Sequence, residues 1–275
     1  MRTYQSALLI LTAFSLINGV SAREVLETTA PVSATAATAE VHSLPPDTHA
    51  PTMKEIAMQQ GAPVKTPQEA LDLLKSGNAN FFSGKGASHQ ESANFRRAQI
   101  MTQTPFAVVL GCSDSRVPIE IVFDQGLGAI FSIRVAGNIT DPATLGSIEY
   151  AVEHLDSKIL VVMGHEGCGA VSAAMLPEAD QKKEAEHVQY LLNAVKPSLK
   201  AMPNIRDKKA RMREAVIANV RWQVAKLKEN PVVAAAVDAG KVRLVGAFYE
   251  ISSGAVDFLE TEEELSLDPP VAAQQ

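Results

Sequence analysis

The chain has 275 residues, a hydrophobic fraction of 46% and a formal net charge of −6 at pH 7. This size and apolar content suit one large globular domain or two small ones. The acidic balance argues against nucleic acid and against an anionic membrane surface as partners. No apolar run in the body of the chain reaches the 18 residues of a membrane span, so no mature transmembrane helix is expected.

The N-terminus is predicted to be a cleaved signal peptide covering residues 1–22. Arg2 supplies a positive end, residues 7–20 are mostly apolar, and Val20-Ser21-Ala22 gives a small-x-small cleavage pattern. A retained short membrane anchor is the alternative, which the shortness of the apolar run disfavours. The prediction makes the protein an exported one, with the periplasm favoured over secretion outside the cell.

The rest of the chain divides by composition. Residues 23–51 are rich in Ala, Thr, Pro and Ser without an apolar period, which predicts a flexible linker. Ordered structure is expected from 52 to about 260 as one domain, followed by a C-terminal tail over 261–275.

Helix and strand signals alternate through this domain. Thr66-Pro67-Gln68-Glu69 is a capping box with proline at the first helical position, and Asp141-Pro142 is a second helix start of the same kind. In chain order the expected elements are a helix from the capping box through Phe82, a strand at 106–110, a short helix at 118–123, a strand at 129–133, a helix from Asp141 to about Leu155, a strand at 158–163, helices at 182–196, 206–229 and 231–239, and a strand at 242–249.

Nearly continuous apolar strands that alternate with helices indicate a parallel sheet covered on both faces. We therefore expect an α/β fold with a mostly parallel central sheet of four to five strands, flanked by helices, and with an N-terminal helical arm. Charged residues at helical spacing from about 180 to 230 indicate a solvated helix face.

Two cysteines follow two of the apolar runs. Cys112 comes directly after the strand at 106–110, while Cys168 lies three residues after His165, which follows the strand at 158–163. The carboxyl ends of parallel strands meet at one edge of a sheet, where α/β proteins have their sites. Two thiolates and one imidazole are the ligand set of a catalytic zinc site with an open fourth position.

Asp114 and Arg116 sharpen this interpretation. The carboxylate could take the fourth metal position, or Arg116 could hold it away in a bidentate pair and leave that position to water. Bound Zn²⁺ lowers the pKa of water from 15.7 toward about 7, and Asp114 could then orient the resulting hydroxide. A disulfide between Cys112 and Cys168 is the competing interpretation for an exported protein, but it leaves Asp114, Arg116 and His165 unexplained.

Residues 112–117 (Cys-Ser-Asp-Ser-Arg-Val) and 164–170 (Gly-His-Glu-Gly-Cys-Gly-Ala) together resemble the β-class carbonic anhydrases. The resemblance extends to the runs at 134–138, 149–152 and 246–249, and it spans roughly residues 60 to 258. It implies an enzyme, a carbonate dehydratase, that reversibly hydrates CO₂ to bicarbonate and a proton.

The resemblance also implies one zinc ion per subunit on Cys112, His165 and Cys168, with Asp114 either as the fourth ligand or as the partner of Arg116. Two alternatives use the same residues. Hydrolysis of carbonyl sulfide or carbon disulfide would need the same nucleophile, and a closed site with Asp114 on the metal would give a non-catalytic zinc-binding domain.

Three further positions match family members that contact substrate or line a narrow apolar pocket: Gln103, Phe131 and Tyr150. Such a pocket suits CO₂, which offers little to hydrogen-bond. In the family a neighbouring subunit completes the pocket, so the resemblance implies a homodimer or tetramer, with the segment 52–82 available to embrace the partner. Val109 stands where members with a second, inhibitory bicarbonate site have tryptophan, so no such site is expected.

Overall fold

A computed structural model describes residues 63–89, 95–96, 99–260 and 265 of the chain. The expected signal peptide, the linker, the first residues of the domain and nearly all of the C-terminal tail lie outside these ranges. None of the helices in the described ranges combines the length and the apolar character that crossing a bilayer requires.

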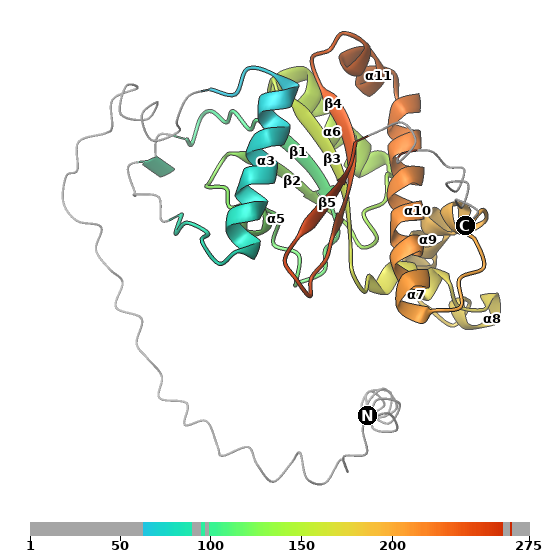
Figure 1. Ribbon diagram of the computed structural model, residues 1–275. Coiled ribbons are helices and arrows are strands. Elements are labelled where there is room, and N and C mark those ends of the chain that lie inside the picture. Colours follow the sequence, from blue (N-terminus) through green and yellow to red (C-terminus); the bar gives the residue numbers. More distant parts are fainter. Residues whose placement is uncertain (1–62, 90–94, 97–98, 261–264, 266–275) are drawn as a thin grey trace, which may run out of the picture. The chain divides into compact units, whose positions relative to one another are not determined.

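A five-stranded sheet forms the centre of the fold (Figure 1). Its strands are β1 (Ala107–Gly111), β2 (Ile130–Arg134), β3 (Ile159–His165), β4 (Arg243–Tyr249) and β5 (Val256–Leu259). Their order is β2-β1-β3-β4-β5, with the first four parallel and β5 antiparallel to β4. The expected mostly parallel sheet is confirmed. The fifth strand is β5, which no pattern in the sequence indicates separately.

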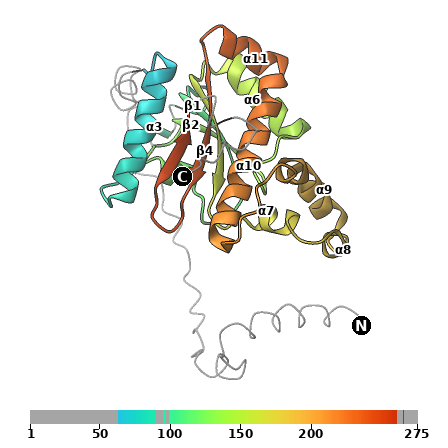
Figure 2. The ribbon, with the colours of Figure 1, turned by 45° about the vertical axis from the view of Figure 1, so that its right-hand side comes forward.

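Helices cover both faces of this sheet (Figure 2). They are α3 (Pro67–Phe82), α5 (Ile119–Val122), α6 (Pro142–His154), α7 (Gly169–Ala174), α8 (Glu178–Gln181), α9 (Glu186–Val195), the 3-10 helix η1 (Lys196–Leu199), α10 (Lys208–Glu229) and α11 (Pro231–Asp238). Successive strand side chains point to opposite faces. In β1, Val108 and Leu110 therefore join the core under α6, α7, α9, α10 and α11, while Ala107 and Val109 join the core under α3 and α5.

Helix α3 begins as the sequence predicts. The Thr66 hydroxyl accepts from the Glu69 N–H at 3.1 Å, and the Glu69 carboxylate accepts from the Thr66 N–H at 3.3 Å. A cap of this kind contributes about 1 kcal/mol. Leu71 and Leu74 are fully buried in the sheet core of the same chain, so α3 packs on its own sheet along at least this face.

The region after β3 differs from the prediction. The expected helix at 182–196 begins only at Glu186, and α7 and α8 precede it. The N–H groups of Lys183 and Glu184 bond back to Asp180 and Gln181, which closes α8 with a turn before α9 can start. Helix α7 starts at a glycine and has no side-chain cap, so it carries none of the usual start signals.

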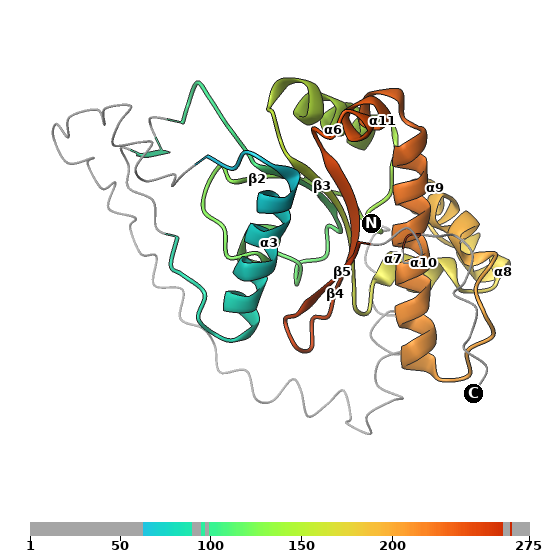
Figure 3. The same ribbon diagram turned by 45° about the horizontal axis from the view of Figure 1, so that its top comes forward.

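Helix α10 lies beside the sheet (Figure 3). It packs closely on two strands that carry glycine at the points of contact. A Cβ atom at Gly164 of β3 would lie 2.5 Å from Val216 Cγ1, and one at Gly246 of β4 would lie 2.8 Å from Val220 Cγ1. Real Cβ atoms do not approach that closely, so the absence of a side chain at these two positions sets the distance between helix and sheet.

Candidate metal centre

The carboxyl ends of β1 and β3 bring the predicted ligands together. Cys112 directly follows β1, His165 is the last residue of β3, and Cys168 is the N-cap of α7. Strand β1 has β2 on one side and β3 on the other, so the winding of the sheet reverses between β1 and β3. In open α/β sheets, ligands bind in the crevice outside the carboxyl ends of the strands at such a switch point.

The donor atoms of Cys112, His165 and Cys168 all lie within 4.8 Å of one another, and all three residues are buried. His165 Nδ1 lies 2.9 Å from the Glu166 carbonyl oxygen. Because that oxygen can only accept, Nδ1 carries the proton and Nε2 a lone pair. Within the described chain, Nε2 is buried without a hydrogen-bond partner, which native structures rarely tolerate. A metal ion among the three atoms would satisfy it, and zinc prefers this donor set.

The two thiols are free, and their pKa values move in opposite directions. The neighbouring Cys168 thiol and the Gly137 N–H lower the pKa of Cys112 despite its burial. The adjacent Cys112 sulfur and burial raise the pKa of Cys168. The pair therefore already favours one thiolate, the form in which cysteine binds metal. The competing disulfide is not formed.

Asp114 is bound by Arg116 at the rim of this cluster. Arg116 Nε donates to Asp114 Oδ1 at 2.9 Å and Nη2 donates to Oδ2 at 2.8 Å, while the Arg116 N–H adds a bond of 3.0 Å. These bonds hold the pKa of the Asp114 carboxyl well below its usual range. Asp114 Oδ2 lies 3.9 Å from His165 Nε2. The carboxylate is thus ionised beside the cluster, and both its oxygens are occupied by arginine.

Arg134, at the end of β2, fixes the loop that carries these groups. Its Nε donates to the Cys112 carbonyl oxygen at 3.0 Å and its Nη2 to the Asp114 carbonyl oxygen at 2.6 Å. Arg134 thereby ties a third strand end to the site. Arg134 belongs to the run 134–138, which resembles the β-class carbonic anhydrases, but nothing in the sequence indicates these hydrogen bonds.

Glu166, which lies between two of the predicted ligands, has a structural role that the sequence does not indicate. Its carboxylate accepts from the Ser252 N–H at 2.9 Å and lies 3.4 Å from Lys209 Nζ. The bond from Ser252 and the nearby ammonium group lower the pKa of Glu166. The loop between His165 and Cys168 is therefore tied to the turn between β4 and β5 and to the start of α10.

The expected substrate contacts lie elsewhere in this chain. Gln103 is exposed in the segment before β1. Phe131 pairs with Val108, four residues before Cys112, which is roughly 13 Å along the strand at 3.3 Å per residue. The Phe131 and Tyr150 rings lie 6.2 Å apart, and Tyr150 is 48% exposed. The chain brings the two aromatic residues together, but well away from its own cluster.

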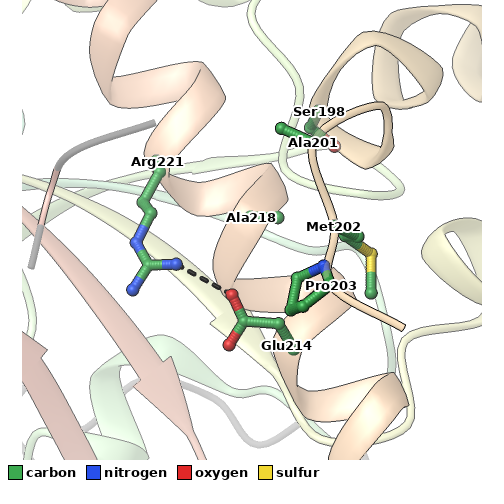
Figure 4. A pocket seen from close by; sticks show the side chains of 7 residues that line it. All are labelled: Ser198, Ala201, Met202, Pro203, Glu214, Ala218 and Arg221. Atoms are coloured by element: carbon green, nitrogen blue, oxygen red, sulfur yellow. Dashed lines mark hydrogen bonds and ion pairs between the residues drawn. The ribbon is translucent and has the colours of Figure 1, made fainter. Parts of the chain in front are cut away.

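Two cavities lie outside the cluster and share none of its residues. The first, of about 20 Å³, holds roughly one water molecule. The Arg221–Glu214 ion pair of 2.9 Å stands at its wall (Figure 4). It is lined by Ser198, Ala201, Met202, Pro203, Glu214, Ala218 and Arg221. The second, of about 130 Å³, lies between α8 and α9.

A mostly parallel sheet that gathers two thiols and one imidazole at its carboxyl edge, beside an ionised aspartate, defines a metal-dependent enzyme of the α/β class. The family model for carbonic anhydrase matches residues 107–256. Carbonic anhydrase 2 of Mycobacterium tuberculosis is 37% identical over 193 residues, which cover 70% of this chain and 92% of that protein. The carbonic anhydrase of Mycolicibacterium smegmatis is 37% identical over 199 residues, covering 71% and 94%.

Solved structures agree. A tetrameric β-carbonic anhydrase from the filamentous ascomycete Sordaria macrospora superposes with a TM-score of 0.57 at 28% identity, covering 68% of this chain and 94% of that one. The chain therefore belongs to the β-class carbonic anhydrases. It is a carbonate dehydratase with zinc as its cofactor, and the Cys112–His165–Cys168 cluster could bind one ion.

Proposed function

We propose that the chain catalyses the reversible hydration of CO₂ to bicarbonate and a proton at the Cys112–His165–Cys168 cluster. One observation carries the proposal. A fully buried imidazole nitrogen has no hydrogen-bond partner in the described chain, although two thiol sulfurs lie within 4.8 Å and an ionised carboxylate within 3.9 Å. The carbonic anhydrase names of the relatives support the same conclusion.

Cys112, His165 and Cys168 would hold the zinc ion. When bound, zinc supplies a Lewis acid that lowers the pKa of a water molecule, so that water can attack CO₂ near neutral pH. Asp114 would accept a hydrogen bond from this water and turn its lone pair toward the carbon. Arg116 keeps the Asp114 carboxylate ionised and hydrogen-bonds to both of its oxygens. This favours Asp114 as the group that orients the water over Asp114 as a fourth zinc ligand. Bicarbonate then leaves, and the proton passes to buffer.

Substitution at Asp114 tests this division of roles. Asp114→Asn should keep most of the zinc but lower the rate of CO₂ hydration in stopped-flow measurements by about tenfold or more, because an amide orients the water poorly. Cys168→Ala should lose zinc and activity together. Asp156→Asn is a matched control, since Asp156 also pairs with a cation two residues along but is 89% exposed on the surface.

Three outcomes would contradict the proposal. If the Asp114→Asn variant were as fast as the wild type, Asp114 would not orient the water. If the Cys168→Ala variant kept its zinc, the ion would not bind at this cluster. If the wild-type protein released sulfide from carbonyl sulfide but did not hydrate CO₂, then CO₂ would not be its substrate.

We also propose that the enzyme is a homodimer or tetramer in which Gln103, Phe131 and Tyr150 of a second copy line the pocket over this cluster. The exposure of Tyr150, and the distance of its neighbour Phe131 from the cluster of its own chain, support this arrangement. The related Sordaria macrospora enzyme is tetrameric. Light scattering should give a mass of two or four subunits, and Tyr150→Ala should slow hydration with zinc content unchanged. A fully active monomer would contradict the proposal.

Export to the periplasm is a further proposal, which rests on the signal-peptide pattern of residues 1–22. Protein recovered from a periplasmic fraction should have the intact mass of a chain whose first residue is Arg23. Full-length chain in the cytoplasmic fraction would contradict it.

A further inference from the structure

A chain of buried amide groups runs from α10 to the loop after β2. Asn219 Nδ2 donates to the Gly137 carbonyl oxygen at 2.8 Å, and Gln223 Nε2 donates to Asn219 Oδ1 at 3.1 Å. Gln223 Oε1 accepts from the N–H and the hydroxyl of Thr140 at 2.9 and 2.8 Å. Asn219 and Gln223 are both fully buried and lie one helical turn apart on the same face of α10. Together they hold both ends of the segment from Gly137 to Thr140.

This segment begins with a strained turn. Gly137 and Asn138 both have positive φ angles, of 75° and 44°. Only glycine adopts such angles freely. A non-glycine residue such as Asn138 keeps them only where the surrounding contacts hold its backbone in place. Around the turn, a Cβ atom at Gly137 would lie 3.2 Å from Ala170 Cβ and 3.3 Å from Val195 Cγ2. The turn is therefore held between α7, α9 and the amides of α10.

The same turn reaches the metal centre. The Gly137 N–H donates to Cys112 Sγ at 3.4 Å. Hydrogen bonds to a ligand atom fix its orientation and tune its interaction with the metal. Asn219 binds the carbonyl of the residue whose N–H binds the sulfur, so a shift of Asn219 would move that N–H.

Apolar side chains would be the simpler choice at these positions of α10. Val216, Val220 and Val224 on the same helix are fully buried in the core. Burying amides among them is costly unless each is paired, and a fully paired network specifies one arrangement. The hydrogen-bond network therefore fixes the position of the loop from Gly137 to Thr140, which apolar side chains at these positions would not do.

We propose that Asn219 and Gln223 are positioning residues for the metal centre, which hold the Gly137 turn so that its N–H stays directed at the Cys112 sulfur. This inference rests on the proposed role of Cys112 as a zinc ligand. In the described part of the chain, neither residue hydrogen-bonds to Cys112, His165 or Cys168, so their effect passes through the backbone of the turn.

The test uses Asn219→Leu, and Asn219→Ser in case leucine prevents folding. Zinc affinity, measured by competition with a chelator well below the melting temperature, should fall about tenfold or more, as expected for loss of an outer-shell contact. In the cobalt-substituted protein, the thiolate-to-metal absorption band should move to longer wavelength, because the sulfur electrons lose the stabilising N–H.

Asn78 provides a matched control in the opposite core. It is also a buried asparagine, and its Nδ2 donates to the Val122 and Gly254 carbonyl oxygens at 3.0 and 2.9 Å while Oδ1 accepts from the Val256 N–H at 2.8 Å. Asn78→Leu and Asn78→Ser should lower the melting temperature of the metal-free protein without shifting the cobalt band or the zinc affinity.

These measurements distinguish failure of the positioning role of Asn219 from failure of the proposed zinc site. Asn219 variants that lose stability but keep the wild-type band and zinc affinity would overturn the inference, as would equal loss of affinity in the Asn78 variants. If the wild-type protein bound no zinc, Cys112 would not be a zinc ligand, and the proposed function itself would be wrong.

Discussion

Replacing Gly164 with alanine would show how firmly α10 is packed on β3 next to His165. The added Cβ would lie 2.5 Å from Val216 Cγ1 and 2.9 Å from Val220 Cγ2, so the helix or the strand would have to shift. Overpacking of a rigid core costs about 1–3 kcal/mol. Because two branched side chains oppose the new atom, we expect the upper part of that range, which lowers the melting temperature by roughly 2–4 °C for each kcal/mol.

A second substitution identifies the cause. Val216→Ala alone removes two buried methyl groups and should cost roughly 2 kcal/mol. Combined with Gly164→Ala, it also removes the nearer clash but leaves the contact with Val220. The double variant should therefore be about 1–2 kcal/mol more stable than the sum of the two single effects predicts.

Urea unfolding of the wild type, both single variants and the double variant measures this coupling. The experiments are done with excess chelator, so that zinc affinity does not enter the free energy of unfolding. Additive effects, within about 0.5 kcal/mol, would refute the packing argument. A Gly164→Ala variant as stable as the wild type would refute it more directly.

Two further predictions concern pH and the metal. Burial alone would raise the pKa of Asp124, but the Ala87 N–H, His89 and Asn80 bind its carboxylate and leave the pKa below its usual value. Its contribution to stability is therefore full above the unfolded pKa of about 3.9 and is lost as the pH falls through the folded value. Urea titrations should find the wild type more stable than Asp124→Asn at pH 7, with the gap closing below about pH 4; a pH-independent gap would contradict this. Chelation of zinc should abolish CO₂ hydration and lower the melting temperature, and added zinc should restore both; an unchanged melting temperature on chelation would argue that the ion binds outside the folded core.

Local sequence signals predicted the elements that begin with a cap or consist of an uninterrupted apolar run. The capping box at Thr66 and the Asp141-Pro142 start both form as expected. Strand β5 gave no such signal, because Val256–Leu259 has only four residues and an exposed aspartate among them. It becomes a strand through antiparallel pairing with β4, a contact that depends on the tight turn between the two strands.

The metal cluster could be predicted because parallel strands end at one edge, which brings Cys112 near His165 whatever the loops do. The supporting contacts could not. Asn219 and Gln223 lie in a helix with many charged residues and resemble solvated side chains in the sequence. They are buried because a loop some eighty residues earlier presents backbone groups to them. The aromatic pair at Phe131 and Tyr150 was predicted from family resemblance, and its part in the pocket stays a prediction.

The placement of the three donor atoms has a mechanical consequence. They come from the end of β1, the end of β3 and the start of α7, so an ion bound by all three would act as a cross-link that closes the long chain segment containing β2 and α6. Closing a long loop removes conformational freedom from the unfolded chain. Loss of the ion would therefore lower the stability of the folded chain as a whole, because the unfolded chain would regain that freedom.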